Sequence, residues 1–509
     1  MEHPCSIGLD EIYARCMITV TDINSVFIKI ECERGVAREI SSFFTFQVPN
    51  FQFTPAYKNK IWDGKIRLFN LINGYLYKGL LDHLLTFASD RSYKVEYFPK
   101  DTMVSITDEE IDAFIESIPV QSGGKAIELY DHQISAIRQS IKKKSLLLLS
   151  PTGSGKSLII YYLVRYLLDA LPPEKKILLV VPTTGLVAQM LNDFKDYSNG
   201  SIENECHVVY AGQEKTSHKR VIISTWQSIY LQPEEYFDQF GGIFGDESHL
   251  FKAKSLTSLM TKLKDCYYRI GTTGTLDGTV VHKLVLEGLF GPVFSVTSTK
   301  DLMDKDLLSK LYIECLILQH PEHKIIEIKK AKYQDELDWL VRNKERNQFI
   351  KTLASKLKGN TLILFNFVEK HGLPLFKDLQ QECSKKSYII YGNTPATDRE
   401  DIRQIVNKEE DCLLVASYGT CSTGINIKNI KNIIFTSPSK SVIRVLQSIG
   451  RGLRKTKDKD KVTVYDIGDD LHWKKYRNHA LRHLDERILI YTNEKFNYTK
   501  RLIRLGVYK

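Results

Sequence analysis

The segment Ser150-Pro151-Thr152-Gly153-Ser154-Gly155-Lys156-Ser157 carries the clearest structural signal in this chain. It follows the apolar run 146–149 and precedes the apolar, helix-forming run 157–168. A glycine-rich loop between a buried strand and a helix is typical of a phosphate-binding loop, because backbone N–H groups and the helix N-terminus then face the anion. We expect the Lys156 ammonium to reach the β- and γ-phosphates of a nucleotide, and the Ser157 hydroxyl to ligate Mg²⁺. The strict pattern of such loops has glycine where Ser150 stands.

Short apolar runs alternate with helical stretches on both sides of a central connector. The first set of runs occupies 146–149, 177–181, 208–210, 221–224, 242–245 and 268–271, and the second occupies 361–365, 388–391, 413–416, 432–435 and 462–465. Strand–helix alternation predicts parallel sheets that are covered by helices on both faces. The sequence therefore predicts two tandem α/β domains, at 125–300 and 346–470, joined by a charged connector at 301–345.

Residues 1–120 differ in character and predict a small mixed α+β domain. Aromatic, β-prone residues occupy 43–48 and 51–53, and Asp63-Gly64 lies between two β-type runs, which indicates a hairpin. At the other end, residues 471–509 predict a basic helical tail. Its last 38 residues, 472–509, hold ten Lys and Arg against three Asp and Glu, interleaved with aromatic residues.

This basic tail allows two interpretations. Basic and aromatic side chains together suit a polyanion with stackable bases, which makes Lys474, Lys475 and Arg477 candidate nucleic-acid contacts. A solvated amphipathic helix would have the same composition. A second basic run, 142–144, is interpreted as lysines beside the C-terminal dipole of a helix.

Composition excludes several classes of protein. The 509 residues are 43% hydrophobic, so the chain can bury several cores, and none of its apolar runs approaches the length of a membrane span. The N-terminus shows no signal-peptide pattern. The nine cysteines are scattered and form no CxxC pair, which argues against zinc ligation and against a disulfide framework. We expect a soluble cytoplasmic protein that makes no membrane contact.

Two further segments carry chemistry. Gly245-Asp246-Glu247-Ser248-His249 ends a predicted strand after the phosphate loop. Asp246 is expected to hold the Mg²⁺ shell, and Glu247 to orient and deprotonate an attacking water. In the second α/β domain, the segment 447–454 supplies Gln447, Arg451 and Arg454. Arginines from a facing domain would stabilise the transition state of phosphoryl transfer when the domains close.

These motifs, in this order, resemble those of superfamily-2 helicases. The resemblance implies two RecA-like lobes with ATP in the cleft between them, and it includes His249 in the acidic box. It also implies that Gln133 contacts the adenine, that Thr272–Thr275 couples hydrolysis to lobe movement, and that Arg454 is the arginine finger, with Arg451 and Gln447 beside the γ-phosphate. Nucleic-acid contacts are implied for Thr183, Thr184, Thr225, Gln227, Asn366 and Thr420.

Details of the motifs favour DNA as the substrate. The acidic box reads Asp-Glu-Ser-His rather than the Asp-Glu-Ala-Asp of the RNA-handling branch, and no Phe-x-x-Pro element precedes Gln133. The segment 58–69 resembles the N-terminal part of phage helicases of recombination and replication restart. That resemblance implies work on D-loops, R-loops and Holliday junctions.

The same segment gives further candidate contacts. Lys58, Lys60 and Lys65 around Trp62 suit phosphate contact and base stacking, whereas the alternative is that Trp62 anchors a core. We therefore expect an ATP- and Mg²⁺-dependent motor that binds single-stranded and branched DNA. We expect it to act as a monomer, with single-strand-binding or recombination proteins as partners. An RNA helicase and an ATP-gated DNA-binding or strand-annealing scaffold remain the alternatives.

Overall fold

A computed structural model describes residues 17–49, 51–100, 106–210, 214–250, 253–276, 280–422, 427, 429–437, 450, 453 and 459–506. The chain divides into two compact units. The first comprises the described residues up to Ser150 and those from Gly155 to Val296. The second comprises those from Thr297 onward, with Pro151–Ser154 grouped with them. Each unit is described by itself.

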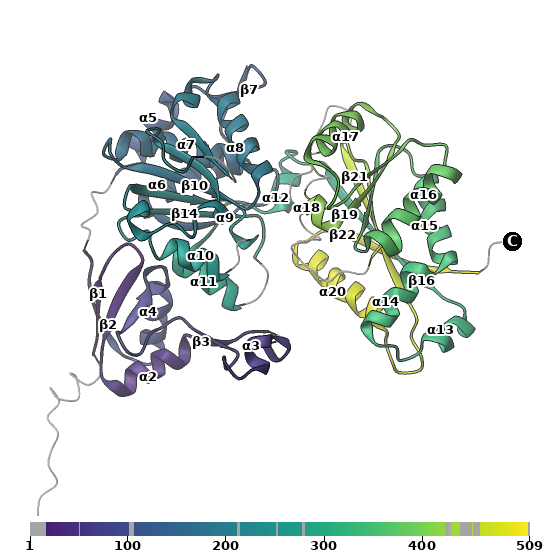
Figure 1. Cartoon of the computed structure of the whole chain (residues 1–509), viewed down its shortest axis with the longest axis horizontal. Helices are drawn as coiled ribbons and strands as arrows, with labels where there is room; N and C mark the ends of the chain where they lie inside the picture. The colour runs from purple at the N-terminus through teal and green to yellow at the C-terminus, as the bar shows by residue number, and fades with distance from the viewer. Residues whose placement is uncertain are drawn as a thin grey trace, which may run out of the picture. The chain divides into compact units, whose positions relative to one another are not determined.

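The first unit begins with a small mixed domain, which Figure 1 shows in purple. Its sheet has the order β5-β2-β1-β6, in which β1 runs antiparallel to β2 and parallel to β6. Alternate residues of β1 are buried, among them Ile18 and Val20, so one face of the sheet packs against helices. The elements are β1 (Met17–Asp22), β2 (Phe27–Glu31), α2 (Arg34–Phe43), β5 (Tyr75–Tyr77), the 3₁₀ turn η2 (Lys78–Leu80), α4 (Leu81–Asp90) and β6 (Lys94–Phe98).

A small module projects from this domain and corrects the predicted hairpin. It contains β3 (Thr45–Gln47), η1 (Phe51–Phe53), α3 (Pro55–Lys58) and β4 (Lys65–Arg67). The strand β4 pairs with β3, not with a strand immediately before Asp63-Gly64. The physical reason is the N-terminal signal of a helix, since the Thr54 hydroxyl accepts from the Tyr57 N–H and Pro55 occupies the first turn of α3. Residues 51–53 form a 3₁₀ turn rather than the expected β structure.

The first lobe is a seven-stranded parallel sheet of order β11-β12-β10-β13-β14-β9-β15. The six strands expected in this region are all present, and β15 was missed because it is only three residues long. The strands are β9 (Ser145–Leu149), β10 (Lys176–Val181), β11 (Cys206–Val209), β12 (Val221–Thr225), β13 (Phe240–Gly245), β14 (Tyr268–Thr273) and β15 (Val293–Ser295).

Helices and short turns complete this lobe. They are α5 (Asp108–Ser117), α6 (Asp131–Lys143), α7 (Lys156–Ala170), α8 (Thr184–Tyr197), η3 (Ser201–Asn204), α9 (Trp226–Ile229), η4 (Glu234–Phe237), η5 (Ser248–Leu250), α10 (Ala253–Met260) and α11 (Val280–Phe290), with a two-residue hairpin of β7 (Gln121–Ser122) and β8 (Lys125–Ala126). The buried central strands, such as Leu178 and Val180 of β10, pack against helices on both sheet faces.

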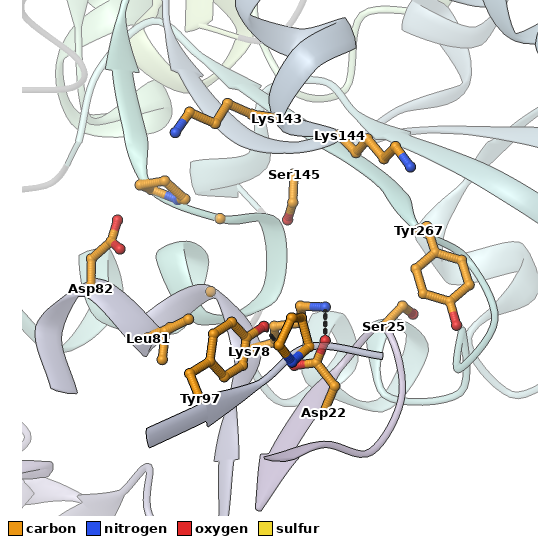
Figure 2. Close-up of a pocket in the computed structure, with 14 residues that line it drawn as sticks. Asp22, Ser25, Lys78, Leu81, Asp82, Tyr97, Lys143, Lys144, Ser145 and Tyr267 are labelled. Atoms are coloured by element: carbon orange, nitrogen blue, oxygen red, sulfur yellow. Dashed lines mark hydrogen bonds and ion pairs between the residues drawn. The ribbon is translucent and has the colours of Figure 1, made fainter. Parts of the chain in front are cut away.

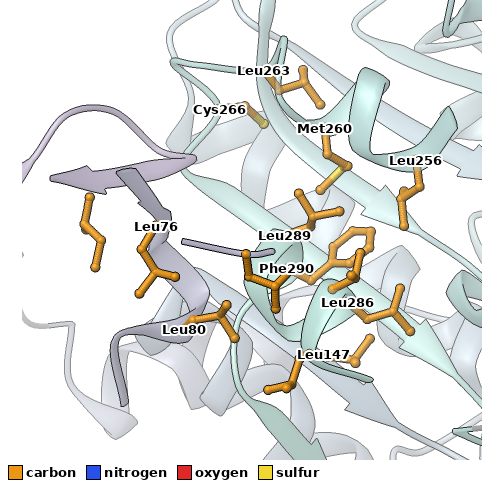
Figure 3. Packing of buried hydrophobic residues seen from close by; sticks show 14 of the residues in the cluster. Leu76, Leu80, Leu147, Leu256, Met260, Leu263, Cys266, Leu286, Leu289 and Phe290 are labelled. Atoms are coloured by element: carbon orange, nitrogen blue, oxygen red, sulfur yellow. The ribbon is translucent and has the colours of Figure 1, made fainter. Parts of the chain in front are cut away.

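One hydrophobic core joins the N-terminal domain to the first lobe. Leu76 and Leu80 pack with Leu286, Leu289 and Phe290 of α11 in a single cluster of buried residues (Figure 3). The backbones also touch closely, because a Cβ atom on Gly79 would lie only 2.0 Å from the Glu287 carbonyl oxygen. The N-terminal domain and the first lobe therefore form one body.

The second unit holds another seven-stranded sheet, of order β18-β19-β17-β20-β21-β16-β22. The expected strands are present as β17 (Thr361–Phe365), β18 (Ser387–Ile390), β19 (Leu413–Ser417), β20 (Asn432–Phe435) and β21 (Lys461–Asp470). The two tandem parallel-sheet lobes and the small mixed N-terminal domain confirm the predicted fold class. The helices are α12 (Thr299–Asp304), α13 (Glu322–Ile328), α14 (Tyr333–Arg342), α15 (Lys344–Lys356), the π-helical turn η6 (Val368–Gly372), α16 (Leu373–Glu382), α17 (Ala396–Lys408), α18 (Tyr418–Ser422) and α20 (His479–Asn493).

Two expectations for the second unit were wrong. The connector 301–345 contains β16 (Lys310–Gln319), an inner strand that pairs in parallel with β21 over its full length. The tail 471–509 is not wholly helical, because its end forms β22 (Asn497–Arg504), the edge strand beside β16. Both strands carry charged residues among their apolar ones. Glu314 divides the apolar residues of β16 into the runs 311–313 and 315–318, and Lys500, Arg501 and Arg504 interrupt those of β22.

Buried ion pairs fix the helices of this unit on its sheet. The Arg487 guanidinium of α20 bonds the Asp466 carboxylate at 2.7 Å, and the two side chains are 1% and 0% exposed. The Arg346 guanidinium of α15 bonds Asp469 at 2.9 Å. Burial alone would raise the pKa of Asp469, but the Arg346 charge and a hydrogen bond from His320 hold it at about 2.

Among the described residues, no helix is long and apolar enough to cross a membrane. No group of three or more His, Cys, Asp and Glu side chains in that part of the chain could hold a metal ion.

Candidate functional site

The phosphate loop turns sharply between β9 and α7. Gly153 and Gly155 have φ angles of +89° and +85°, which glycine adopts without strain. The Ser150 N–H donates to the Thr273 carbonyl at 2.8 Å, which ties the start of the loop to β14. The Lys156 ammonium donates to the Ser150 carbonyl at 3.1 Å, so it points back over the loop. The Lys156 ammonium therefore lies over the loop at which we expect phosphates to bind.

Gln133 lies directly against this loop. A Cβ atom on Gly155 would be 2.1 Å from Gln133 Nε2, so only glycine allows the side-chain amide to approach the loop this closely. The other end of the amide is fixed, because the Tyr130 N–H donates to Gln133 Oε1 at 2.9 Å at the start of α6. The structure thus places Gln133 beside the phosphate loop, and its contact with adenine, which the resemblance implies, stays a prediction.

The acidic box follows β13 and faces the same loop. The Asp246 carboxylate accepts from the Thr272 hydroxyl at 2.6 Å and from the Glu247 N–H at 2.9 Å. Burial and the neighbouring Glu247 raise the pKa of Asp246 to about 6, while Lys156 and the Thr272 hydroxyl lower it. Lys156 Nζ lies 3.8 Å from Glu247 Oε1. A desolvated carboxylate beside an ammonium is a polar site suited to a phosphate-bound cation.

Glu247 adopts an uncommon backbone conformation for a residue with a side chain. Its φ angle is +49°, in the left-handed region, and such strain is concentrated at functional sites. The buried His249 ring contacts Thr273 and Glu247. Its Nδ1 lies 2.7 Å from Thr273 Oγ1 and 3.5 Å from Glu247 Oε2. The geometry therefore links the acidic box to the 272–275 motif through side-chain contacts, which the sequence spacing alone did not show.

The donor set near the loop fits Mg²⁺. This cation prefers oxygen ligands and takes few of them from the protein. The Asp246 carboxylate and the Ser157 hydroxyl, the latter in the first turn of α7, are oxygen groups that would suit such a cation. Ser157 Oγ lies 2.9 Å from the hydroxyl of Tyr197, a contact at the end of α8 that no sequence motif indicated.

The candidate nucleic-acid residues of the first lobe meet at the carboxyl edge of its sheet. The strands β10 and β12 are parallel neighbours, with Val181 opposite Thr225, so the residues that follow them are brought together. The Thr183 hydroxyl caps α8 through the Leu186 N–H, and Thr184 is exposed beside it. Gln227 is exposed and bonds the Pro182 carbonyl at 3.2 Å, and Thr225 contacts Ser228.

The second lobe shows a similar arrangement, with one correction. The strands β17 and β19 are neighbours, with Phe365 opposite Ser417, which places Asn366 near the turn 417–420. The Asn366 N–H donates to the Ser437 hydroxyl. Thr420, however, is 6% exposed, and its hydroxyl bonds Ser417 at 2.7 Å. The surface at this turn is therefore formed by Ser417 and Gly419, because α18 turns the Thr420 side chain inward.

Gln447, Arg451 and Arg454 lie outside the described residues. In the N-terminal module, Lys58, Lys60 and Lys65 are exposed, and Trp62 is half-buried, with its indole N–H bonded to the Lys65 carbonyl. Trp62 is therefore not a buried core anchor.

In the basic tail, Lys474 and Lys475 occupy a turn before α20, and Arg477 pairs with Asp485 at 2.8 Å. Arg487 of the same tail belongs to the core.

Comparison with known proteins assigns the three parts of the chain. Residues 18–97 match the family described as "DNA helicase UvsW, N-terminal", residues 126–278 match "Type III restriction enzyme, res subunit", and residues 344–456 match "Helicase conserved C-terminal domain". A DNA 3′-5′ translocase, XPB2, of Sulfurisphaera tokodaii is 24% identical over 69% of this chain and 84% of its own length.

Solved structures agree with this assignment. A fragment of an HsdR subunit of a type I restriction enzyme from Vibrio vulnificus shares the fold, with a TM-score of 0.57 at 16% identity over 78% of this chain and 72% of that chain. The crystal structure of T4 UvsW matches with a TM-score of 0.52 at 30% identity, covering 96% of this chain and 99% of that one.

In sequence, the ATP-dependent DNA helicase uvsW of Enterobacteria phage T4 is 32% identical over 495 residues, which cover 94% of this chain and 98% of the relative. These motifs, this fold and this full-length similarity show that the chain belongs to the superfamily-2 helicases, as a member of the UvsW family of ATP-dependent DNA helicases.

Proposed function

We propose that this helicase remodels branched DNA intermediates of recombination and replication, such as D-loops, R-loops and Holliday junctions. The observation that carries the catalytic part is the contact network of the first lobe. It joins the phosphate loop, the acidic box and the 272–275 motif through Lys156, Asp246, Glu247, Thr272 and His249. Full-length similarity to T4 UvsW supports the choice of DNA.

In this proposal Lys156 and the loop N–H groups bind the β- and γ-phosphates of ATP. Ser157 and Asp246 would hold Mg²⁺, which would neutralise charge that develops on the phosphates. Glu247 orients a water and accepts its proton as the water oxygen bonds to the γ-phosphorus. The bond from that phosphorus to the β–γ bridging oxygen then breaks, and ADP leaves. Arg454, with Arg451 and Gln447, is proposed to stabilise the transition state.

The strand of DNA would be held at the carboxyl edges of both sheets, mainly through phosphates and therefore without sequence preference. Thr184 and Gln227 of the first lobe, and Asn366 of the second, supply polar groups there. Lys58, Lys60, Trp62 and Lys65 would contact the duplex beside a branch. We propose that the enzyme acts as a monomer in the host cytoplasm, with single-strand-binding or recombination proteins as partners.

The test compares nucleic acids as activators of ATP hydrolysis. Single-stranded DNA, linear duplex, a four-way junction and single-stranded RNA are each added to the wild type, with Lys156→Ala as the inactive reference. Lys215→Ala serves as the matched control, because Lys215 is exposed on the loop before β12, away from the phosphate loop.

Strong activation by junction and single-stranded DNA, together with ATP-dependent displacement of a strand, is the expected result. Activation mainly by RNA would instead support an RNA helicase. Hydrolysis without strand displacement would support a DNA-binding or annealing scaffold.

A further inference from the structure

A cavity of about 410 Å³ lies between the N-terminal domain and the first lobe, within the first unit (Figure 2). This volume is in the range of small-ligand sites, roughly 300–1,000 Å³. The N-terminal domain contributes the end of β1, the turn η2, the start of α4 and the end of β6 with the residue that follows it. The first lobe contributes the end of α6 and the segments that lead into β9, β14 and β15.

The cavity is separate from the nucleotide site. Ser145, Tyr267 and Pro292 line it, and they stand at or just before the first residues of β9, β14 and β15. The cavity therefore opens at the amino edge of the sheet. The phosphate loop follows the opposite end of β9, so a nucleotide bound there cannot occupy this cavity.

The wall that the N-terminal domain supplies contains a neutralised carboxylate. Asp22 accepts from Lys78 Nζ at 2.7 Å, from the Tyr97 hydroxyl at 2.8 Å and from the Lys100 N–H at 3.2 Å. Its charge is thus balanced within the wall. Asp82 is the other acidic residue among those that line the cavity.

The opposite wall is basic. Lys143 ends α6 and Lys144 follows it; both lie across the cavity from the Asp22–Lys78 pair, with their side chains extending in opposite directions (Figure 2). Lys143 is exposed, and it forms no ion pair with the carboxylates of the described residues. By contrast, its neighbour Lys142 bonds Asp108 at 2.9 Å and does not line the cavity. The Lys143 side chain, the Asp22–Lys78 pair, Tyr97 and Tyr267 therefore line one space. Lys144 also lines it, and its Nζ lies 5.8 Å from the centroid of the Tyr268 ring, outside this lining.

The seam that forms the cavity is rigid. The Ser25 hydroxyl donates to the Leu263 carbonyl at 2.8 Å, and the buried Arg269 guanidinium holds the same carbonyl at 3.0 Å. Gly79 lies against the Glu287 carbonyl without room for a Cβ atom. A site built across such a seam is preorganised, because no ordering of its walls is needed when a ligand binds.

We propose that this cavity is a second DNA site, which binds one nucleotide unit of a DNA strand that leaves a branch. Lys143 and Lys144 contact phosphate, and a base enters between the tyrosine rings and the apolar side chains of Leu81 and Pro292. Lysine supplies phosphate contacts without sequence preference, and aromatic faces stack on any base. This inference rests on the proposed function in branched-DNA remodelling, and it adds a contact on the sheet edge that the motor motifs do not use.

The test uses two neighbouring lysines of α6. Lys143→Glu changes the charge at the cavity, whereas Lys142→Glu makes the same change of charge one residue away. Binding of the full-length protein to a fluorescent four-way junction is measured by anisotropy across a range of salt concentrations, alongside ATP hydrolysis with single-stranded DNA.

Lys143→Glu is expected to bind the junction about tenfold more weakly, and the slope of log K against log salt should fall by about one. Adding Lys144→Gln should lower the slope further. Hydrolysis with single-stranded DNA should stay within about twofold of the wild type in every variant.

Identical junction binding by Lys143→Glu and Lys142→Glu would overturn the second site. A wild type without preference for the junction over linear duplex would instead refute the proposed function, so the two failures are distinguishable. A further arm tests a free nucleotide as the occupant. Binding of ADP by Lys156→Ala that disappears when Lys143→Glu is added would also overturn the assignment to DNA.

Discussion

Arg269 is the buried cation that connects three parts of the first unit, and replacing it with methionine tests how this unit is held together. Its side chain is fully buried on β14. Nε donates to the Leu289 carbonyl at 2.8 Å, Nη1 to the Leu263 carbonyl at 3.0 Å and Nη2 to the Met260 carbonyl at 3.0 Å. Methionine would keep the aliphatic volume and remove the guanidinium donor from all three carbonyls, of which that of Leu263 retains the Ser25 hydroxyl.

The expected loss follows from these contacts. A hydrogen bond to a charged group contributes about 1.5–3 kcal/mol, so three such bonds contribute about 4.5–9 kcal/mol. Part of this loss is offset, because methionine removes the cost of burying a charge. That cost is evident from the pKa of Arg269, which burial lowers to about 10. A net destabilisation of about 3–5 kcal/mol is expected, since the Met260 and Leu289 carbonyls lose the Arg269 donor in a buried setting, while the Leu263 carbonyl retains the Ser25 hydroxyl. Arg269→Lys should lose about half as much, because one ammonium cannot reach all three oxygens.

Native-state hydrogen exchange of the full chain measures this effect, because it reports the opening free energy of one unit in a multi-domain protein. In Arg269→Met, the opening free energy measured at the amides of β1 and β14 should fall by about 3–5 kcal/mol. Arg91→Met is the control, since Arg91 is an exposed arginine of the N-terminal domain that pairs with Glu39 at 3.4 Å. Protection in Arg269→Met within about 1 kcal/mol of the wild type would refute the reasoning.

Four other outcomes are expected. Lys156→Ala should abolish ATP turnover while DNA binding survives, and normal turnover in steady-state assays would contradict the assignment of the phosphate loop. Glu247→Gln should slow hydrolysis by roughly 10²–10⁴-fold with ATP affinity retained, because only proton transfer to a base is lost; single-turnover kinetics separate the two quantities. Gly79→Ala should destabilise the N-terminal domain against the first lobe by about 1–3 kcal/mol or more, since its Cβ atom would overlap a helix carbonyl, and the exchange experiment above measures this too. Neutralising Lys474, Lys475 and Arg477 should flatten the salt dependence of DNA binding, and an unchanged slope would mean that the turn before α20 is only solvated.

The strands that could be predicted are those whose residues are apolar throughout. In β10 and β12 nearly every side chain is buried on one face or the other, so a continuous hydrophobic run marked them. β16 and β22 were not predicted, because charged residues interrupt the apolar residues of both strands. β22 is an exposed edge strand with Lys500, Arg501 and Arg504, which resembles a solvated tail in composition. β16 alternates in burial at its start, and Glu314 in its middle hid it within a charged segment.

The sequence predicted those parts of the candidate site that lie within recognisable motifs. The loop glycines and the acidic pair carry their chemistry in their own residue types. Tyr197, by contrast, reaches Ser157 from the far end of another helix, and only the fold brings the two hydroxyls together. The cavity was also beyond sequence reasoning. Lys143 was interpreted as one of three lysines at a helix end, and nothing in the sequence separates it from Lys142, which is ion-paired.

The strand β14 shows why the N-terminal domain belongs to the motor rather than merely preceding it. Its six residues span about 20 Å at 3.3 Å per residue, from one edge of the sheet to the other. At its carboxyl end, Thr272 and Thr273 contact Asp246 and His249 of the nucleotide site. At its amino end, Arg269 is anchored beside Ser25 and the wall of the cavity. Because packed cores are stiff, a displacement of β14 at the nucleotide site must also move the elements that Arg269 holds. The N-terminal domain therefore moves together with the first lobe as one body.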